Sequence, residues 1–249
     1  MAIPSKFLTT PFTNVHKDAV LQVKFLRRHV DGESEMPLTF APVSEYASTV
    51  PDWMRLAGGF IVPLHFTERL IIEVKSPKQY PFAVKATMGD ECVLTGRLKM
   101  HGLDQGERRT EKRVLPFQNY LTTRFNDRIE SRYTGNGHHE PLIAEQNPVM
   151  IELEIYPLLA DRWVPPEPLK LQNDSPVLVL EAKPGTCFDY GRIPRHINVD
   201  GYDLPIFHDD HGPKVYDQNT LARIRLHLVT VMQWEVITGK PIEYASLTR

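Results

Sequence analysis

The chain has 249 residues and a formal net charge of −2, with 29 Lys and Arg against 31 Asp and Glu. This balance gives no electrostatic case for binding nucleic acid or an acidic membrane surface. The hydrophobic fraction of 41% is that of an ordinary soluble protein, and no run approaches the roughly 18 apolar residues that a membrane-spanning helix needs.

The N-terminal sequence bears on the compartment. The stretch MAIPSKFLTTPF has neither the basic region nor the apolar region of a signal peptide, so we expect a cytoplasmic protein. Two cysteines, Cys92 and Cys187, are too few for a disulfide framework, although one bridge between them stays open. Residues 1–43 are predicted to be an N-terminal extension with a single strand at 19–26, and the whole of 1–249 to be one β-rich domain.

Short apolar runs rich in β-branched residues recur along the chain, and each is closed by Pro, Gly, Asp or Asn. Such runs predict strands. In chain order they lie at 19–26, 60–65, 69–75, 82–88, 91–99, 113–121, 149–156, 176–182 and 222–231.

Two of these runs alternate strictly between apolar and polar residues. In 149–156, Glu152 and Glu154 share one side of the predicted strand, and the apolar residues share the other. In 222–231, two arginines and a histidine oppose isoleucine and leucine. Alternation of this kind is typical of an antiparallel sheet with one buried face and one face in water. We therefore interpret Glu152 and Glu154 as solvent-facing positions.

The many predicted strands, punctuated by 21 prolines, predict an all-β fold. An antiparallel β-sandwich, a jelly-roll-like domain and a partly closed barrel all fit this pattern. Only two short helices are expected. One covers 44–57, with Ser44 as its N-cap and Gly58 after its end. The other covers 231–238 and ends at Gly239.

Two segments lack a clear period. Residues 122–147 form a long irregular loop, of the kind that often serves as a lid or a binding loop. Within it, His138, His139 and Glu140 are candidate acid–base residues beside a Gly-rich turn, and an exposed hairpin tip is the alternative. The Pro-rich segment 161–176 is predicted to connect the two sheets of one sandwich.

The stretch LPIFHDDHGPKVYDQNT at 204–220 carries the candidate metal ligands His208, Asp210 and His211. A His-x-Asp pair is the near half of the facial triad of non-haem iron oxygenases, which also needs a distal histidine. The only later histidine is His227, which lies in a predicted strand just after the pair. The distal ligand of the triad is usually far along the sequence, so the sequence offers no clear third ligand. We therefore favour a polar turn, in which the aspartates cap backbone groups, and expect neither a metal nor a cofactor.

Aromatic residues occur in nearly every predicted strand. Most must form the core, but a sandwich rich in aromatic side chains can also leave a ligand pocket at one end. Arginines would then anchor a polar group of the ligand. The candidate ligand-binding residues are Trp53, Tyr80, Tyr120, Trp163, Arg69 and Arg225.

No nucleophile elbow, phosphate-binding loop or dinucleotide fingerprint occurs in the sequence. The leading hypothesis is therefore a β-sandwich binding protein that holds an apolar or aromatic small molecule, or a partner protein. One alternative is an enzyme of unfamiliar type, an isomerase or cyclase that positions its substrate and uses a histidine or carboxylate for acid–base chemistry. Another is a structural subunit that forms homo-oligomers through its sheet faces.

Three stretches, 57–96, 149–157 and 211–241, resemble in order segments of a widespread microbial family of uncharacterised soluble proteins. The resemblance is carried by Gly58-Gly59 ahead of a predicted strand, by PFAVK at 81–85, and by the pattern W-x-x-I-T-G near the C-terminus. It covers about half of the chain. It implies that residues 57–241 form one fold unit, and it implies no catalytic residue.

Overall fold

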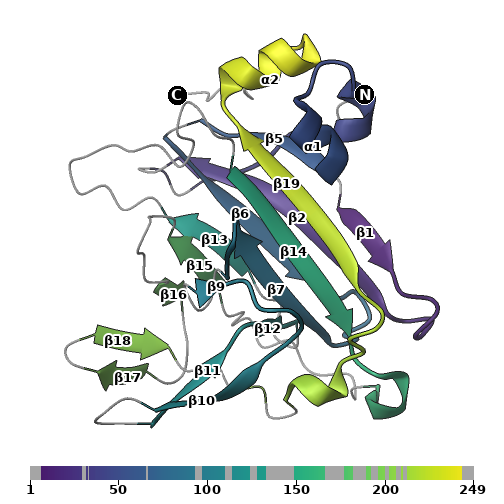
Figure 1. The fold of residues 1–249 in the computed structure, drawn as a ribbon, viewed down its shortest axis with the longest axis vertical. Coiled ribbons are helices and arrows are strands. Elements are labelled where there is room, and N and C mark those ends of the chain that lie inside the picture. Colours follow the sequence, from purple (N-terminus) through teal and green to yellow (C-terminus); the bar gives the residue numbers. More distant parts are fainter. Residues whose placement is uncertain are drawn as a thin grey trace.

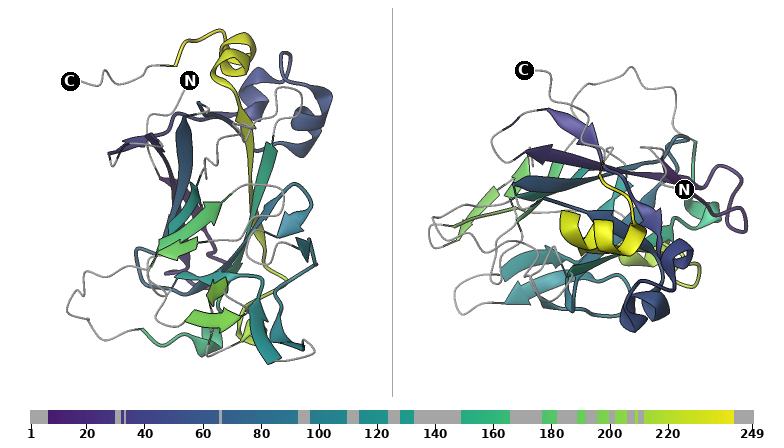
Figure 2. Two further views of the ribbon diagram at one scale, coloured as in Figure 1. Left: turned by 90° about the vertical axis from the view of Figure 1, so that its left-hand side faces the viewer. Right: turned by 90° about the horizontal axis from the view of Figure 1, so that it is seen from above.

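Two large β-sheets lie face to face in the computed structural model (Figures 1 and 2). The structure describes residues 7–29, 32, 34–65, 67–92, 97–109, 114–123, 128–132, 149–165, 177–181, 189–191, 196–199, 202–205, 209 and 212–242.

The first sheet has the strand order β1-β2-β6-β13-β15-β16, with β3 paired to β2. Its strands are β1 (Leu8–Pro11), β2 (Val20–His29), β3 (Glu35–Pro37), β6 (Glu68–Lys75), β13 (Arg128–Arg132), β15 (Val177–Glu181) and β16 (Asp189–Gly191).

The second sheet has the order β4-β5-β19-β14-β7-β8-β9, with β12 paired to β7. Its strands are β4 (Ala41–Pro42), β5 (Phe60–Pro63), β7 (Phe82–Met88), β8 (Glu91–Cys92), β9 (Arg97–Leu98), β12 (Leu121–Thr122), β14 (Val149–Pro157) and β19 (Ala222–Val229). Two separate hairpins pair β10 (Gln105–Arg109) with β11 (Val114–Gln118), and β17 (His196–Val199) with β18 (Tyr202–Pro205).

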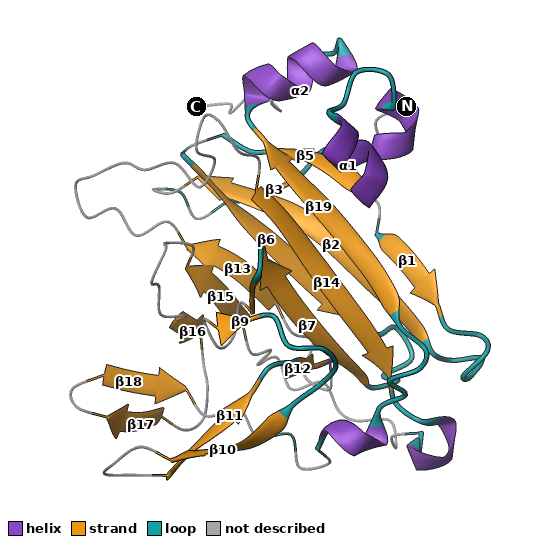
Figure 3. Ribbon diagram, viewed as in Figure 1, coloured by secondary structure: helices purple, strands orange, loops and turns teal. Residues whose placement is uncertain are grey.

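Helix is scarce in the described part of the chain (Figure 3). The two α-helices are α1 (Asp52–Ala57) and α2 (Val231–Thr238), and short 3₁₀ turns occupy Val43–Tyr46, Ala160–Arg162 and Pro213–Val215. Neither α-helix has the length or the apolar character to cross a membrane.

The predicted all-β fold is confirmed. Pairing is mostly antiparallel, and the exceptions are the parallel pairs β13–β15 and β5–β19. No described strand pairs across the two large sheets, so the described arrangement is the sandwich alternative.

The main core fills the space between the two sheets. The first sheet contributes the inner faces of β2 and β6, and the second sheet those of β7, β14 and β19. Alternate residues point inward along each strand, as strand geometry requires. The buried residues include Leu21, Val23, Phe25, Leu70, Ile72, Val74, Val84, Ala86, Ile151, Leu153, Ile155, Ile224, Leu226 and Leu228.

Each of the nine predicted strand runs overlaps a described strand. The prediction of one strand within 1–43 is wrong, because β1, β2, β3 and β4 all lie there. Strand β1 reads LTTP and has no apolar run, so its pairing with β2 leaves no signal in the sequence. Strand β13 falls in the segment 122–147 that was expected to be irregular. The assignment of 1–249 to one domain stays a prediction.

The helix at 231–238 is confirmed, and its two ends are explained by the sequence. Thr230 accepts a hydrogen bond from the backbone N–H of Gln233, and the Gln233 side chain accepts one from Thr230, which completes a capping box. Gly239 then ends the helix in the left-handed conformation at φ 66°.

The single helix predicted at 44–57 is wrong. A 3₁₀ turn at Val43–Tyr46 and the helix α1 replace it, and Ser44 caps neither of them. Pro51 explains the break, because proline has no N–H to donate and disfavours the helical conformation of the residue before it.

A smaller apolar cluster lies under α1 and α2, on the outer face of the second sheet. Met54 of α1 and Trp234 and Ile237 of α2 pack there against Ile61 and Val229. This packing fixes α1 over the end of β19, where the polar side chains described next begin.

Candidate functional site

The outer face of the second sheet carries six charged side chains that we call the charged layer: Lys85, Lys99, Glu152, Glu154, Arg223 and Arg225. Strand β14 lies between β7 and β19 in the sheet. In one cross-strand row Glu152 lies between Thr87 and Arg225, and in the next row Glu154 lies between Lys85 and Arg223. Lys99 reaches the layer from the segment that follows β9.

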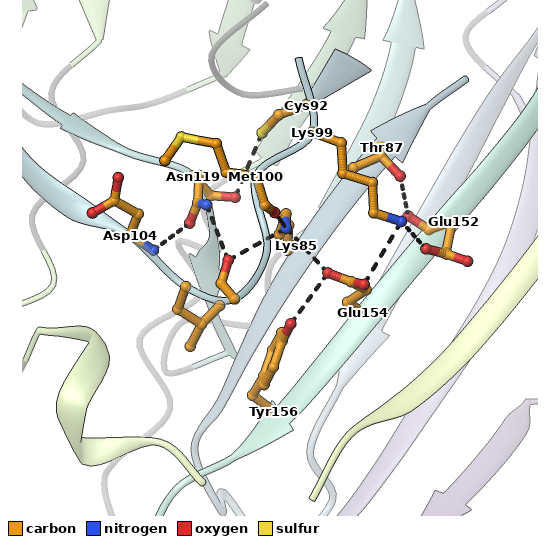
Figure 4. Close-up of polar contacts among 12 residues, drawn as sticks. Lys85, Thr87, Cys92, Lys99, Met100, Asp104, Asn119, Glu152, Glu154 and Tyr156 are labelled. Atoms are coloured by element: carbon orange, nitrogen blue, oxygen red, sulfur yellow. Dashed lines mark hydrogen bonds and ion pairs between the residues drawn. The ribbon is translucent and has the colours of Figure 1, made fainter. Parts of the chain in front are cut away.

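Each carboxylate of the charged layer is held by two or more cations. Arg225 Nε donates to Glu152 Oε2 over 2.6 Å, and Lys99 Nζ donates to the other oxygen of Glu152. Lys85 Nζ lies 3.1 Å from Glu154 Oε2, and Arg223 Nε lies 3.3 Å from Glu154 Oε1. The lysine contacts are drawn in Figure 4.

The interpretation of Glu152 and Glu154 as solvent-facing is wrong. Glu152 is 3% exposed and Glu154 is 2% exposed, while Lys85 is completely buried. The chain after β9 accounts for this burial, because Lys85 donates hydrogen bonds to the backbone oxygens of Met100 and Gly102 (Figure 4). This segment covers the polar side chains that the alternating pattern had placed in water.

The two glutamates remain ionised despite their burial. Burial by itself would raise the pKa of Glu152, but the hydrogen bonds from Lys99 and Arg225 outweigh it and lower that pKa from its ordinary value of 4.5. Burial would also raise the pKa of Glu154, but the hydrogen bond from Lys85 outweighs this effect. The pKa of Glu154 is therefore lowered from its ordinary value as well. Burial and the charge of Glu154 raise the pKa of Tyr156, whose hydroxyl donates to Glu154.

The charged layer holds four cations and only two carboxylates, which leaves an excess of two positive charges. The side chains of Lys99, Arg225 and Arg223 are 29%, 32% and 47% exposed. Among the described residues no other carboxylate forms an ion pair with these cations. The layer therefore presents positive charge to its surroundings and keeps negative charge beneath.

The C-terminal end of helix α1 contacts strand β19, which carries Arg223 and Arg225. Arg225 Nη1 donates to the backbone oxygen of Ala57 over 2.7 Å, and His227 Nε2 donates to that of Gly58 over 2.7 Å. These bonds satisfy carbonyl groups that a helix end leaves unpaired. At Gly59, with φ +91°, a side-chain Cβ would lie 2.8 Å from the Cβ of Arg225 and would overlap its backbone. Gly59 therefore has a packing role at this position.

His227 is completely buried and neutral. Burial lowers its pKa from 6.5, and the charge of Arg225 lowers it further, against the opposing effect of the bond to Gly58. Because Nε2 carries the proton, Nδ1 is an acceptor, and it has no partner among the described residues. The ring of Trp53 lies edge-on to the imidazole at 5.3 Å.

The predicted ligand-binding residues do not meet in one place. Tyr80 is buried beside the ring of Trp163, at 5.0 Å, and Tyr120 is buried with its hydroxyl donating to Asp209. Arg225 belongs to the charged layer, and half-exposed Trp53 lies next to that layer. Arg69 lies on β6, and its side chain is outside the described atoms.

The other sequence-predicted sites lie outside the described residues. These are the acid–base candidates His138, His139 and Glu140, and the metal candidates His208, Asp210 and His211. Both hypotheses stay predictions. The described part of the chain holds no group of three or more His, Cys, Asp or Glu residues suited to a metal ion.

Two residues close to those predictions are described. Asp209 is buried, and its carboxylate accepts the hydroxyl of Tyr120 over 2.9 Å, which ties Asp209 to the sandwich. Cys92 is a free, buried cysteine, while Cys187 lies outside the described residues.

Comparison with known protein families, with curated proteins and with solved structures finds no match to this chain. The resemblance to the microbial family therefore gains no support from these comparisons. Function has to be inferred from the residues of the chain and from their geometry.

Proposed function

We propose that this protein is a β-sandwich binding protein that holds a small molecule, or a partner protein, against the charged layer. The observation that carries the proposal is the exposure of Lys99, Arg223 and Arg225 above two buried and ionised glutamates. In this proposal the protein acts in the cytoplasm, which cell fractionation would check. Its net charge of −2 argues against nucleic acid and an acidic membrane as partners.

The exposed cations are held in place before any ligand arrives. Arg225 is fixed at Nε by Glu152 and at Nη1 by Ala57. Lys99 is fixed by Glu152. Side chains that are already ordered lose little conformational entropy on binding, which favours affinity for a ligand of matching charge. A face that served only as a solvated surface would not need such fixed arginines.

Binding is favoured over the enzyme alternative at this site. An acid–base catalyst works best with a pKa near the operating pH, whereas Glu152 and Glu154 have pKa values lowered from 4.5. The Lys85 ammonium is completely buried and is bound to Glu154, Met100 and Gly102. These groups are therefore suited to building a fixed electrostatic surface rather than to moving protons.

The proposal is tested by nuclear magnetic resonance of the purified protein with a cellular small-molecule extract. We expect signals of the charged layer and of Trp53 to shift, and we expect Arg223→Gln to weaken the shifts. Arg162→Gln is the matched control, because Arg162 is an exposed arginine paired with Asp161 away from the layer. Shifts confined to other parts of the protein, or shifts unchanged in Arg223→Gln, would contradict the proposal.

A further inference from the structure

The excess of two positive charges in the charged layer defines the ligand that would balance it. Resting on the proposed function, we propose that the group recognised there is the doubly charged phosphate of a small-molecule phosphate monoester. A phosphate monoester carries about −1.5 to −2 charges at neutral pH and offers three strong acceptor oxygens. A single carboxylate would leave one positive charge of the layer uncompensated.

The exposed cations still have N–H groups to donate. Arg223 uses only its Nε, toward Glu154, so both of its terminal nitrogens are without a partner in the described part of the chain. Arg225 uses Nε and Nη1, which leaves Nη2. Arginine offers its donors in a planar fork that matches phosphate oxygens, and such charge-assisted hydrogen bonds are the strong ones. Lys99 adds a point charge beside them.

The buried glutamates do not stand in the way of an anion. Both oxygens of Glu152 accept hydrogen bonds, from Lys99 and from Arg225. Both oxygens of Glu154 are also engaged, by Arg223 on one side and by Lys85 on the other. Both carboxylates are also almost completely buried, so an approaching ligand meets the half-exposed cations first.

The spacing of the two arginines fits a single phosphate group. Arg223 and Arg225 are two residues apart on one face of β19, in neighbouring cross-strand rows. At about 3.3 Å per residue, this spacing is about 6.6 Å, which one phosphate group between the two side chains can bridge.

Thermal unfolding with and without inorganic phosphate at pH about 7.5, with ionic strength held constant by sodium chloride, tests the proposal. We expect phosphate at tenfold excess over its dissociation constant to raise the unfolding midpoint by about 3–6 °C. Methyl phosphate should act alike, and acetate should have little effect. Arg223→Gln and Lys99→Gln should each remove most of the rise, whereas Arg162→Gln should keep it. The midpoint of each variant without phosphate shows whether it is folded.

The outcomes separate this inference from the proposed function. One outcome is that the cellular extract shifts signals of the charged layer while phosphate and methyl phosphate do not stabilise the protein. In that case the assignment of a phosphate ligand is wrong, and the proposal that the charged layer binds a ligand is retained. If neither has an effect, both proposals fail. A phosphoserine peptide that binds where methyl phosphate does not would overturn the small-molecule assignment. A rise that persists in both Arg223→Gln and Lys99→Gln would place phosphate elsewhere.

Discussion

The two faces of β14 are both buried, but by opposite means. On the inner face, Leu153 and Ile155 meet apolar side chains of the first sheet. On the outer face, Glu152 and Glu154 meet cations and a covering segment of chain. An alternating pattern therefore identifies which residues share a face of a sheet. It does not tell whether that face meets water, because the cover comes from elsewhere in the sequence.

The two faces should also differ in how they respond to substitution. Apolar burial is non-directional. Removal of a buried methyl group lowers stability through the lost transfer free energy and through the cavity that remains. Buried ion pairs are directional, and removal of one partner strands a charge in the interior.

The largest effect is expected at Lys85. Lys85→Ala leaves the Glu154 carboxylate with one fewer cation in a fully buried position, so we expect the free energy of unfolding to fall by about 3–5 kcal/mol in urea titration. Leu153→Ala on the inner face should cost about 2–5 kcal/mol for the cavity that it leaves.

Rescue separates the two cases. Lys85→Met combined with Glu154→Leu removes both charges, and most of the lost stability should return, because no fully buried charge is then left unpaired, and Arg223, which also loses Glu154, is about half exposed. Adding Glu154→Leu to Leu153→Ala should bring no such recovery. Equal behaviour in the two double variants would show that the outer face depends on packing alone.

A smaller loss is expected at Gly59, where helix α1 meets β19. Gly59→Ala combines a positive φ with overlap against the backbone of Arg225, so we expect a loss of about 2–3 kcal/mol. Gly89→Ala is the control, because Gly89 also has a positive φ but has open space around it, and about 1 kcal/mol is expected there. Similar losses at both glycines would argue against the close approach of Gly59 to Arg225.

Acid should weaken the outer face before it affects the inner one. The folded-state pKa values of Glu152 and Glu154 lie below 4.5, so the unfolded chain binds protons more readily than the folded chain. The stability that these groups contribute is present above about pH 4.5 and is lost as the pH falls through the folded values. Urea titrations at several pH values should show a shallower acid loss in a variant with Gln at both positions. An unchanged acid loss would contradict the ion pairing.

The smallest effect is expected at His227. Its folded-state pKa is lowered from 6.5, so its contribution to stability is complete above that pH and declines as the pH falls below it. Between pH values of about 7.5 and 5.5, where the glutamates stay ionised, the wild-type protein should lose stability and His227→Gln should lose less. Parallel pH profiles of the two proteins would mean that His227 is not held neutral by the fold.

Local pattern was enough to predict nine strand-forming runs and one of the helices. The nine apolar runs and the Thr230–Gly239 caps are signals within a few residues of the element that they specify. Strand β1 was missed because LTTP contains no apolar run, although its partner β2 follows directly in the chain. Strand β13 was missed because its pairing with β6 joins segments distant in the chain. The segment 44–57 was also misjudged, where Pro51 was the overlooked signal.

Only part of the charged layer could be predicted from the sequence. Glu152 and Glu154, and Arg223 and Arg225, stand at the same two-residue spacing on two alternating runs, which is a signal for cross-strand ion pairs. Arg225 was singled out only as a polar anchor for a ligand, and not for this spacing. Lys99 carried no such signal, because it joins the layer through a covering segment rather than through a strand.

The most direct test of the account is a phosphate titration that follows the arginine Nε–H signals by nuclear magnetic resonance. We expect the signals of Arg223 and Arg225 to shift and saturate together, while that of Arg162 stays in place. Equal and unsaturated shifts of all three signals would show general screening by salt, and would contradict a built anion site on the outer face of the second sheet.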